Sequence, residues 1–163
     1  MARWMWILTW VSAIGLLTLL FDKQLARQFN PNEAPSSVVQ GNQTSVKLKR
    51  NRQGHYVTSG LINGEPVVFL LDTGATQVSV PSHLAQELGL KAGQRFLVST
   101  ANGRIEVAST QLDSVQIGNI ELRNISANIN PGMQSDEILL GMSALNQLEF
   151  SQSGDVLTLT YSY

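Results

Sequence analysis

The sequence predicts an all-β, barrel-like domain that follows an N-terminal transmembrane helix. Short apolar or alternating segments recur through residues 45–163, and turn signals separate them. This pattern is typical of β-barrels and β-sandwiches. One of the turn signals is Asn63-Gly64, a pair that favours the type I′ turn of a two-residue β-hairpin. The helix is indicated by residues 4–21, a stretch that contains no charged side chain.

The N-terminal stretch is long enough to cross a bilayer. The chain has 163 residues, of which 43% are hydrophobic and 14% are charged, so one ordinary domain leaves an extra segment to explain. As a helix, residues 4–21 would rise about 27 Å, close to the hydrocarbon thickness of a membrane. A cleaved signal peptide is the competing interpretation, but its apolar core is shorter and ends at a small-x-small site. Residues 21–26 offer no such site, so we expect residues 1–22 to be an uncleaved anchor.

A flexible linker is expected between the anchor and the domain. Residues 23–44 are polar, contain scattered Pro, Gly, Asn and Ser, and show no periodicity, as flexible linkers do. The domain itself is expected over residues 45–163. Arg3 lies on one side of the apolar stretch and Lys23 and Arg27 on the other, so the positive-inside rule leaves the orientation open. We assign the domain to the periplasmic or extracytoplasmic side.

Within the domain, turn residues divide the chain into short strands and one or two short helices. Alternation indicates half-exposed strands, and Gly89 stands where a helix C-terminal cap belongs. Asn102-Gly103 is a second type I′ hairpin signal, and Gly118-Asn119 is a further turn. The expected strands are residues 46–49, 55–62, 67–71, 77–80, 95–100, 104–108, 111–117, 120–129, 137–141 and 156–161, and the expected helical turns are residues 81–89 and 142–148.

The segment with most chemical information runs from residue 67 to Ala75. Residues 67–71 are five consecutive apolar residues, which predicts a strand covered on both faces. Asp72, Thr73 and Gly74 follow directly, and glycine permits a tight turn. A carboxylate at the end of a buried strand is costly unless it is hydrogen-bonded or used. Asp72 is therefore a candidate catalytic acid, and the alternative is a capping residue of an Asx-turn.

Two motifs give the chain a resemblance to a known family. The first is Asp-Thr-Gly-Ala at residues 72–75 after an apolar strand, and the second is Ile-Leu-Leu-Gly-Met-Ser-Ala-Leu at residues 138–145. In these motifs and in Thr-Ala-Asn-Gly at residues 100–103, the chain resembles the bacterial membrane-anchored members of the retropepsin-like (clan AA) aspartic proteases. The similarity covers residues 45–163. The flap tip is less glycine-rich than in retroviral enzymes, and Met142 stands where many of those enzymes carry Arg.

The resemblance implies a fold and a set of site residues. The fold would be the retropepsin-like acid-protease barrel, with Asp72 as the catalytic residue. Thr73, Gly74, Ala75, Leu140 and Gly141 would support the active-site loop. Thr100, Ala101, Asn102 and Gly103 would form the substrate-binding flap.

One chain supplies only half of such a site. Peptide hydrolysis by carboxylates needs one as general base and a second, protonated one on the scissile carbonyl. The chain contains a single Asp-Thr-Gly, so activity on a peptide or protein substrate would require a homodimer related by a two-fold axis. The sequence thus predicts a membrane-anchored aspartic endopeptidase with an Asp dyad formed by homodimerisation. The alternative is a non-catalytic membrane-tethered β-domain that binds extended peptides or an envelope protein.

Other functions are disfavoured by composition. The chain has no cysteine, and its two histidines, His55 and His83, lack ligand-like spacing, so we expect no metal and no cofactor. The basic residues within 47–52 could suggest nucleic acid or anionic lipid. Residues 45–163 nevertheless hold more acids than bases, so we expect a solvated hairpin edge and no nucleic-acid partner.

Overall fold

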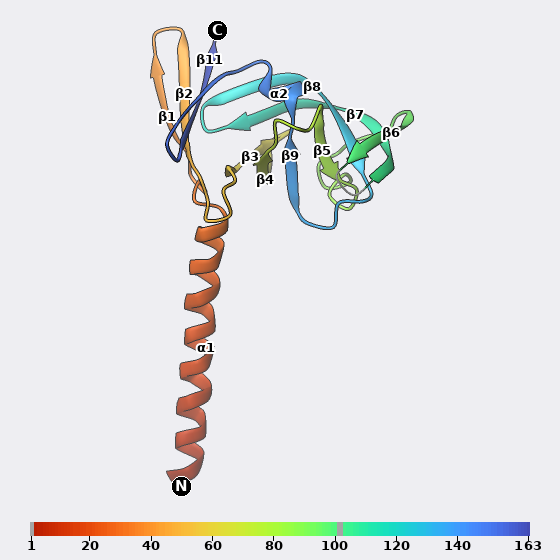
Figure 1. Ribbon diagram of the computed structural model, residues 1–163. Coiled ribbons are helices and arrows are strands. Elements are labelled where there is room, and N and C mark those ends of the chain that lie inside the picture. The colour runs from red at the N-terminus through yellow and green to blue at the C-terminus, as the bar shows by residue number, and fades with distance from the viewer. Residues whose placement is uncertain (1, 101–102) are drawn as a thin grey trace.

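The computed structural model describes residues 2–100 and 103–163 and shows a long helix joined to a β-rich domain (Figure 1). Helix α1 (Ala2–Phe29) projects away from the domain. Trp4–Phe29 is long and apolar enough to cross a membrane, and its most apolar part is not buried by the rest of the chain. Because this helix is apolar on all sides and uncovered, it differs from an amphipathic helix that packs on a soluble core.

The larger sheet carries the predicted site. Its strand order is β3-β4-β9-β5-β8-β7-β6, and β3 also pairs with β7, so the sheet curls towards closure. Pairs β4–β9 and β5–β8 are parallel and the remaining pairs are antiparallel. The strands are β3 (Val57–Ile62), β4 (Glu65–Leu71), β5 (Val78–Pro81), β6 (Arg95–Thr100), β7 (Gly103–Ile117), β8 (Ile120–Asn130) and β9 (Glu137–Leu140).

A second sheet joins the two ends of the domain. Its order is β1-β2-β11-β10, with strands β1 (Ser36–Gln40), β2 (Gln43–Lys49), β10 (Glu149–Ser153) and β11 (Val156–Ser162). The short helix α2 (Met142–Leu145) lies between β9 and β10. The chain is therefore mostly β with few helices, as the sequence predicts.

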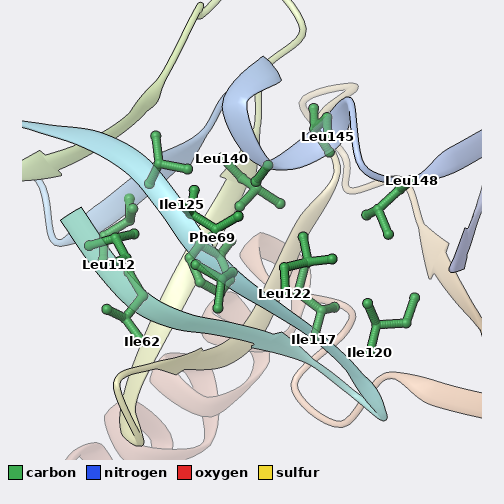
Figure 2. Packing of buried hydrophobic residues seen from close by; sticks show 14 of the residues in the cluster. Ile62, Phe69, Leu112, Ile117, Ile120, Leu122, Ile125, Leu140, Leu145 and Leu148 are labelled. Carbon is green, nitrogen blue, oxygen red and sulfur yellow. The ribbon is translucent and has the colours of Figure 1, made fainter. Parts of the chain in front are cut away.

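The hydrophobic core lies against the strand that leads to the predicted site. Phe69 of β4 and Leu140 of β9 are fully buried, together with Leu112, Leu122 and Ile125 of the β7–β8 hairpin (Figure 2). Covering these side chains is the main source of stability for the strands. The core thus fixes β4 and β9 side by side, and both strands end at the same edge.

Two hairpin predictions are confirmed by backbone geometry. Asn63 and Gly64 both have positive φ, 53° and 88°, and they connect Ile62 to its partner Glu65, as a type I′ turn requires. The turn at Gly118-Asn119 likewise links β7 to β8. Of the second Asn-Gly pair, Asn102 lies outside the described residues.

The linker expectation for residues 23–44 differs from the structure and is corrected. Helix α1 continues to Phe29, and residues 36–40 form β1, which pairs with β2. Asn30 and Asn32 are buried, at 7% and 5% exposure. Asn32 donates from Nδ2 to the carbonyls of Lys49 and Val57, and its Oδ1 accepts from the Lys49 N–H. Asn32, one of the polar residues that suggested a flexible segment, therefore serves to satisfy backbone groups of the domain.

Four smaller expectations also differ. Pro81 ends β5 and residues 82–89 form consecutive turns without a helix, and residues 104–108 and 111–117 belong to one long strand, β7. Helix α2 ends at Leu145, before the expected Leu148. In the run 67–71 only Phe69 is fully buried. One face of β4 is therefore partly open in the single chain.

Candidate active site

Asp72 follows β4 at the edge where β4 and β9 end. Its N–H donates to the Leu140 carbonyl of β9 at 3.2 Å, and its own carbonyl accepts from the Ala75 N–H at 3.2 Å. One carboxylate oxygen, Oδ1, accepts the N–H of Gly74 at 2.8 Å. This contact is the Asx-turn considered for the sequence. It occupies only one oxygen, and Oδ2 has no hydrogen-bond partner in the described part of the chain.

The loop after Asp72 is fixed by helix α2. The first N–H groups of a helix lack partners within the helix. In α2 the N–H of Met142 donates to the Ala75 carbonyl at 2.8 Å, and that of Ser143 to the Thr76 carbonyl at 3.0 Å. The Ser143 hydroxyl oxygen accepts the Val78 N–H at 3.0 Å. These contacts fix the position and direction of the loop that carries Asp72.

Gly141 lies directly against the backbone of the loop that follows Asp72. A Cβ on Gly141 would lie 2.6 Å from the carbonyl carbon of Gln77 and 2.7 Å from the carbonyl oxygen of Ala75. Its φ of −88° is ordinary, so the need for glycine is steric. The structure therefore brings Asp72, Gly74, Ala75, Leu140 and Gly141 together.

Two hollows flank the Asp72 turn. The first, of about 450 Å³, lies between residues 74–79 and β6. The second, of about 390 Å³, is lined by Asp72, Thr73 and mostly apolar side chains, among them Leu71 and Phe150. Thr73 is exposed, and its hydroxyl makes no hydrogen bond within residues 2–100 and 103–163. Among the residues that line the two hollows, Asp72 is the only acid.

The predicted flap corresponds to the end of the β6–β7 hairpin. Thr100 pairs with Gly103, and the Thr100 hydroxyl donates to the Gly103 carbonyl at 2.8 Å. Ala101 and Asn102, which complete the predicted flap, lie outside the described residues. The described base of the hairpin contributes residues 96–100 to the wall of the first hollow.

Sequence reasoning missed several residues of this site. Ser143 and Gln77 were not singled out, although Ser143 lies inside the second motif. Tyr56 was also missed: it lines the second hollow, and its hydroxyl is buried without a partner among the described residues. Asn128 and Asn130 line the first hollow from β8. In the sequence these two residues belong to the polar face of the alternating segment 124–130, which ordinarily faces solvent, so no local signal marked them as site residues.

Comparison with known proteins gives consistent matches. The family model described as gag-polyprotein putative aspartyl protease matches residues 58–147. A crystal structure of a retropepsin-like aspartic protease from Rickettsia conorii superposes with a TM-score of 0.61 and 33% identity, covering 78% of this chain and 95% of that one.

Two curated relatives are longer than this chain. An uncharacterized protein in the cobV 5′ region of a Sinorhizobium species is 34% identical over 135 residues, which is 81% of this chain and 58% of the relative. An uncharacterized protein of Rickettsia prowazekii (strain Madrid E) is 35% identical over 122 residues, 71% of this chain and 51% of the relative. The chain thus spans little more than half the length of these curated relatives.

Proposed function

This chain belongs to the retropepsin-like aspartic protease family, and we propose that it is a membrane-anchored endopeptidase whose catalytic residue is Asp72. The observation that carries the proposal is the setting of the Asp72 carboxylate. Its Oδ1 is held by the Gly74 N–H, while Oδ2 makes no hydrogen bond in the described part of the chain. A carboxylate oriented through one oxygen keeps the other available for water or substrate.

The proposed site is completed by a second copy of the chain. A single carboxylate cannot act as base and acid on the same peptide bond, and the two hollows offer no other acid. The exposed Thr73 and the largely apolar hollow beside Asp72 suit burial against an identical surface, which a two-fold axis supplies. Thr73 would then hydrogen-bond across the axis, and Gly74 would allow the two turns to approach.

In the proposed dimer the two Asp72 carboxylates share one proton, because adjacent like charges disfavour double ionisation. The ionised carboxylate takes a proton from water while the oxygen of that water bonds to the scissile carbonyl carbon. The protonated carboxyl gives its proton to the carbonyl oxygen, so a gem-diol forms. Transfer of a proton to the amide nitrogen and loss of a hydroxyl proton then break the C–N bond and restore the shared proton. We therefore expect the highest rate at acidic to mildly acidic pH.

The substrate is proposed to bind as an extended strand beneath the β6–β7 hairpin. Thr100, Ala101, Asn102 and Gly103 would close over it as a flap. A strand-like peptide gains main-chain hydrogen bonds from such a surface, and side pockets give specificity. No metal, cofactor or nucleic acid takes part in this proposal.

Helix α1 is proposed as the membrane anchor, with residues 4–21 in the bilayer. Confinement to a membrane raises the effective concentration of two copies and so favours the dimer. The domain is placed on the periplasmic or extracytoplasmic side. A cleaved signal sequence has the same apolar character, and the N-terminal sequence of the membrane-bound protein distinguishes the two.

The test of the catalytic role is Asp72→Asn in the full chain in detergent micelles. Cleavage of a peptide library, read by mass spectrometry, should fall by about 10²–10⁴-fold or more because acid and base are both lost. The thermal unfolding midpoint should stay close to that of wild type. Asp113→Asn is the matched control, since Asp113 is exposed on β7. Undiminished cleavage by Asp72→Asn would reject the proposal, and peptide binding by wild type without turnover would favour a non-catalytic module.

A further inference from the structure

The first hollow beside the Asp72 turn has a polar floor and an apolar wall. The wall comes from β6, where Phe96, Leu97 and Val98 line it. The floor comes from β5 and β8, which are paired in parallel with Ser79 opposite Asn128. Neighbouring Val78 and Val80 point into the core, so strand alternation turns Ser79 towards the hollow.

The floor residues form a hydrogen-bonded chain. The Ser79 hydroxyl donates to Asn128 Oδ1 at 2.8 Å and accepts from Asn130 Nδ2 at 3.4 Å. Asn130 Oδ1 accepts the Gly132 N–H at 2.8 Å. All three side chains are buried, at 5–7% exposure. These hydrogen bonds fix the orientation of the Asn128 and Asn130 side-chain amides. They leave the Nδ2 group of Asn128 without an acceptor among the described residues.

Gln77 adds an unused acceptor to the residues that line this hollow. Its Oε1 is buried and has no hydrogen-bond partner in the described part of the chain. Gln77 lines the same hollow as Asn128. Leaving a buried acceptor without a hydrogen bond costs free energy. A bound group that donates a hydrogen bond to Gln77 Oε1 would remove that cost.

We propose that this hollow is the substrate pocket for a carboxamide side chain, Asn or Gln, of an extended peptide. The inference rests on the peptidase function proposed above and specifies its substrates. A primary amide presents an NH₂ donor for Gln77 Oε1 and a carbonyl acceptor for Asn128 Nδ2. A carboxylate offers only acceptors, a lysine only donors, and a leucine neither. The methylene groups of the side chain would lie against the apolar wall of β6.

The first experiment profiles cleavage by the full-length wild-type protein with a peptide library. One position near the scissile bond should favour Asn and Gln over Leu by about tenfold, the factor expected for one well-placed hydrogen bond. Gln77→Leu should reduce the ratio of kcat/KM for Gln and Leu peptides by a similar factor. Gln77→Glu should move the preference towards Lys and Arg, because the carboxylate accepts charge-assisted hydrogen bonds. A purely structural role for Gln77 would not produce that change of preference.

The matched control is Gln53→Leu, an exposed glutamine outside the hollow, which should keep the wild-type profile. Wild-type cleavage without enrichment of Asn or Gln at any position overturns the pocket while leaving the protease intact. An unchanged preference in Gln77→Leu overturns it as well.

Binding separates this inference from the catalytic one. Asp72→Asn should bind a fluorescent peptide pool with a fixed central Gln about tenfold more tightly than a pool with a fixed central Leu, and Gln77→Leu in that background should remove the difference. Equal binding of the two pools, or binding of neither, overturns the carboxamide pocket. Absence of cleavage by wild type together with a Gln-selective binding difference would reject the protease function and support the pocket.

Discussion

Gly141→Ala is expected to displace the active-site loop without touching Asp72. The new methyl carbon would lie 2.7 Å from the Ala75 carbonyl oxygen and 2.6 Å from the Gln77 carbonyl carbon. Both are backbone atoms, so no side-chain rotation can relieve the overlap. Ordinary contact begins near 3.4 Å, so the Ala75 carbonyl must move by about 0.7 Å, and the Gln77 carbonyl oxygen, which lies nearest to the new methyl carbon, must move further.

The size of the effect follows from the contacts that this movement stretches. The Met142 N–H to Ala75 carbonyl bond of 2.8 Å and the Ser143 N–H to Thr76 carbonyl bond of 3.0 Å are each worth about 1 kcal/mol. Overpacking adds about 1–3 kcal/mol. We expect a loss of about 3–5 kcal/mol in the free energy of unfolding, hence a fall of roughly 6–20 °C in Tm. Misplacement of Asp72 by this amount should lower kcat by up to about 10²-fold.

The assay combines thermal unfolding by circular dichroism with peptide cleavage at a temperature where the variant is folded. Gly154→Ala is the control, because its Cβ would meet nothing within 4 Å although its φ is +58°. The control should lose about 1–2 kcal/mol from backbone strain and keep its kcat. Wild-type Tm and kcat in Gly141→Ala would refute the reasoning that the β9–α2 junction positions the catalytic loop.

Three further predictions concern the junction, the anchor and the dimer. Asn32→Ala should lower the free energy of unfolding by about 3 kcal/mol, because three hydrogen bonds to the backbone of Lys49 and Val57 are lost. The exposed Asn119→Ala should change it by less than about 0.5 kcal/mol; equal Tm values for the two variants would contradict the account of the junction. Deletion of residues 1–22 should move the protein from the membrane to the soluble fraction. Dilution of the deleted protein should lower its specific activity, and concentrating it should restore that activity. Retention of the deleted protein in the membrane would reject the anchor. Since the chain has no native cysteine, Thr73→Cys should form a disulfide-linked dimer on oxidation in membranes and Gln53→Cys should not; equal cross-linking of the two variants would reject the proposed interface.

Local sequence patterns predicted the hairpins and the strand content well. Asn63-Gly64 determines its turn through positive φ at both residues, a requirement that two neighbouring residues express by themselves. The join between helix and domain was not predictable in the same way. Asn32 looks like a linker residue, because its partners Lys49 and Val57 are distant in the sequence. A buried asparagine that satisfies remote backbone groups has no local signature.

The same distinction applies to the site. Asp72, Gly74 and the Leu140-Gly141 pair were predicted because short motifs carry them, and the structure places them together. Their assigned roles in catalysis remain predictions. Gln77 and Asn128 were not found, since they line the same hollow only because β5 pairs in parallel with β8. Parallel pairs join segments that are far apart in the chain, and neither residue has a distinctive neighbour.

The junction and the proposed dimer together constrain how the enzyme would meet its substrate. Two copies whose α1 helices enter one bilayer from the same side can share a two-fold axis only along the membrane normal. The Asn51 side chain donates to the Phe29 carbonyl at 3.0 Å, and Asn30 donates to the Ser59 hydroxyl at 2.9 Å. The domain is thus tied to the end of α1 by hydrogen bonds. An extended peptide placed symmetrically across that axis would run parallel to the membrane surface. Residues 22–29 of α1 raise the domain by only about 12 Å, so the proposed active site would favour peptide segments that lie along the bilayer, close to its surface.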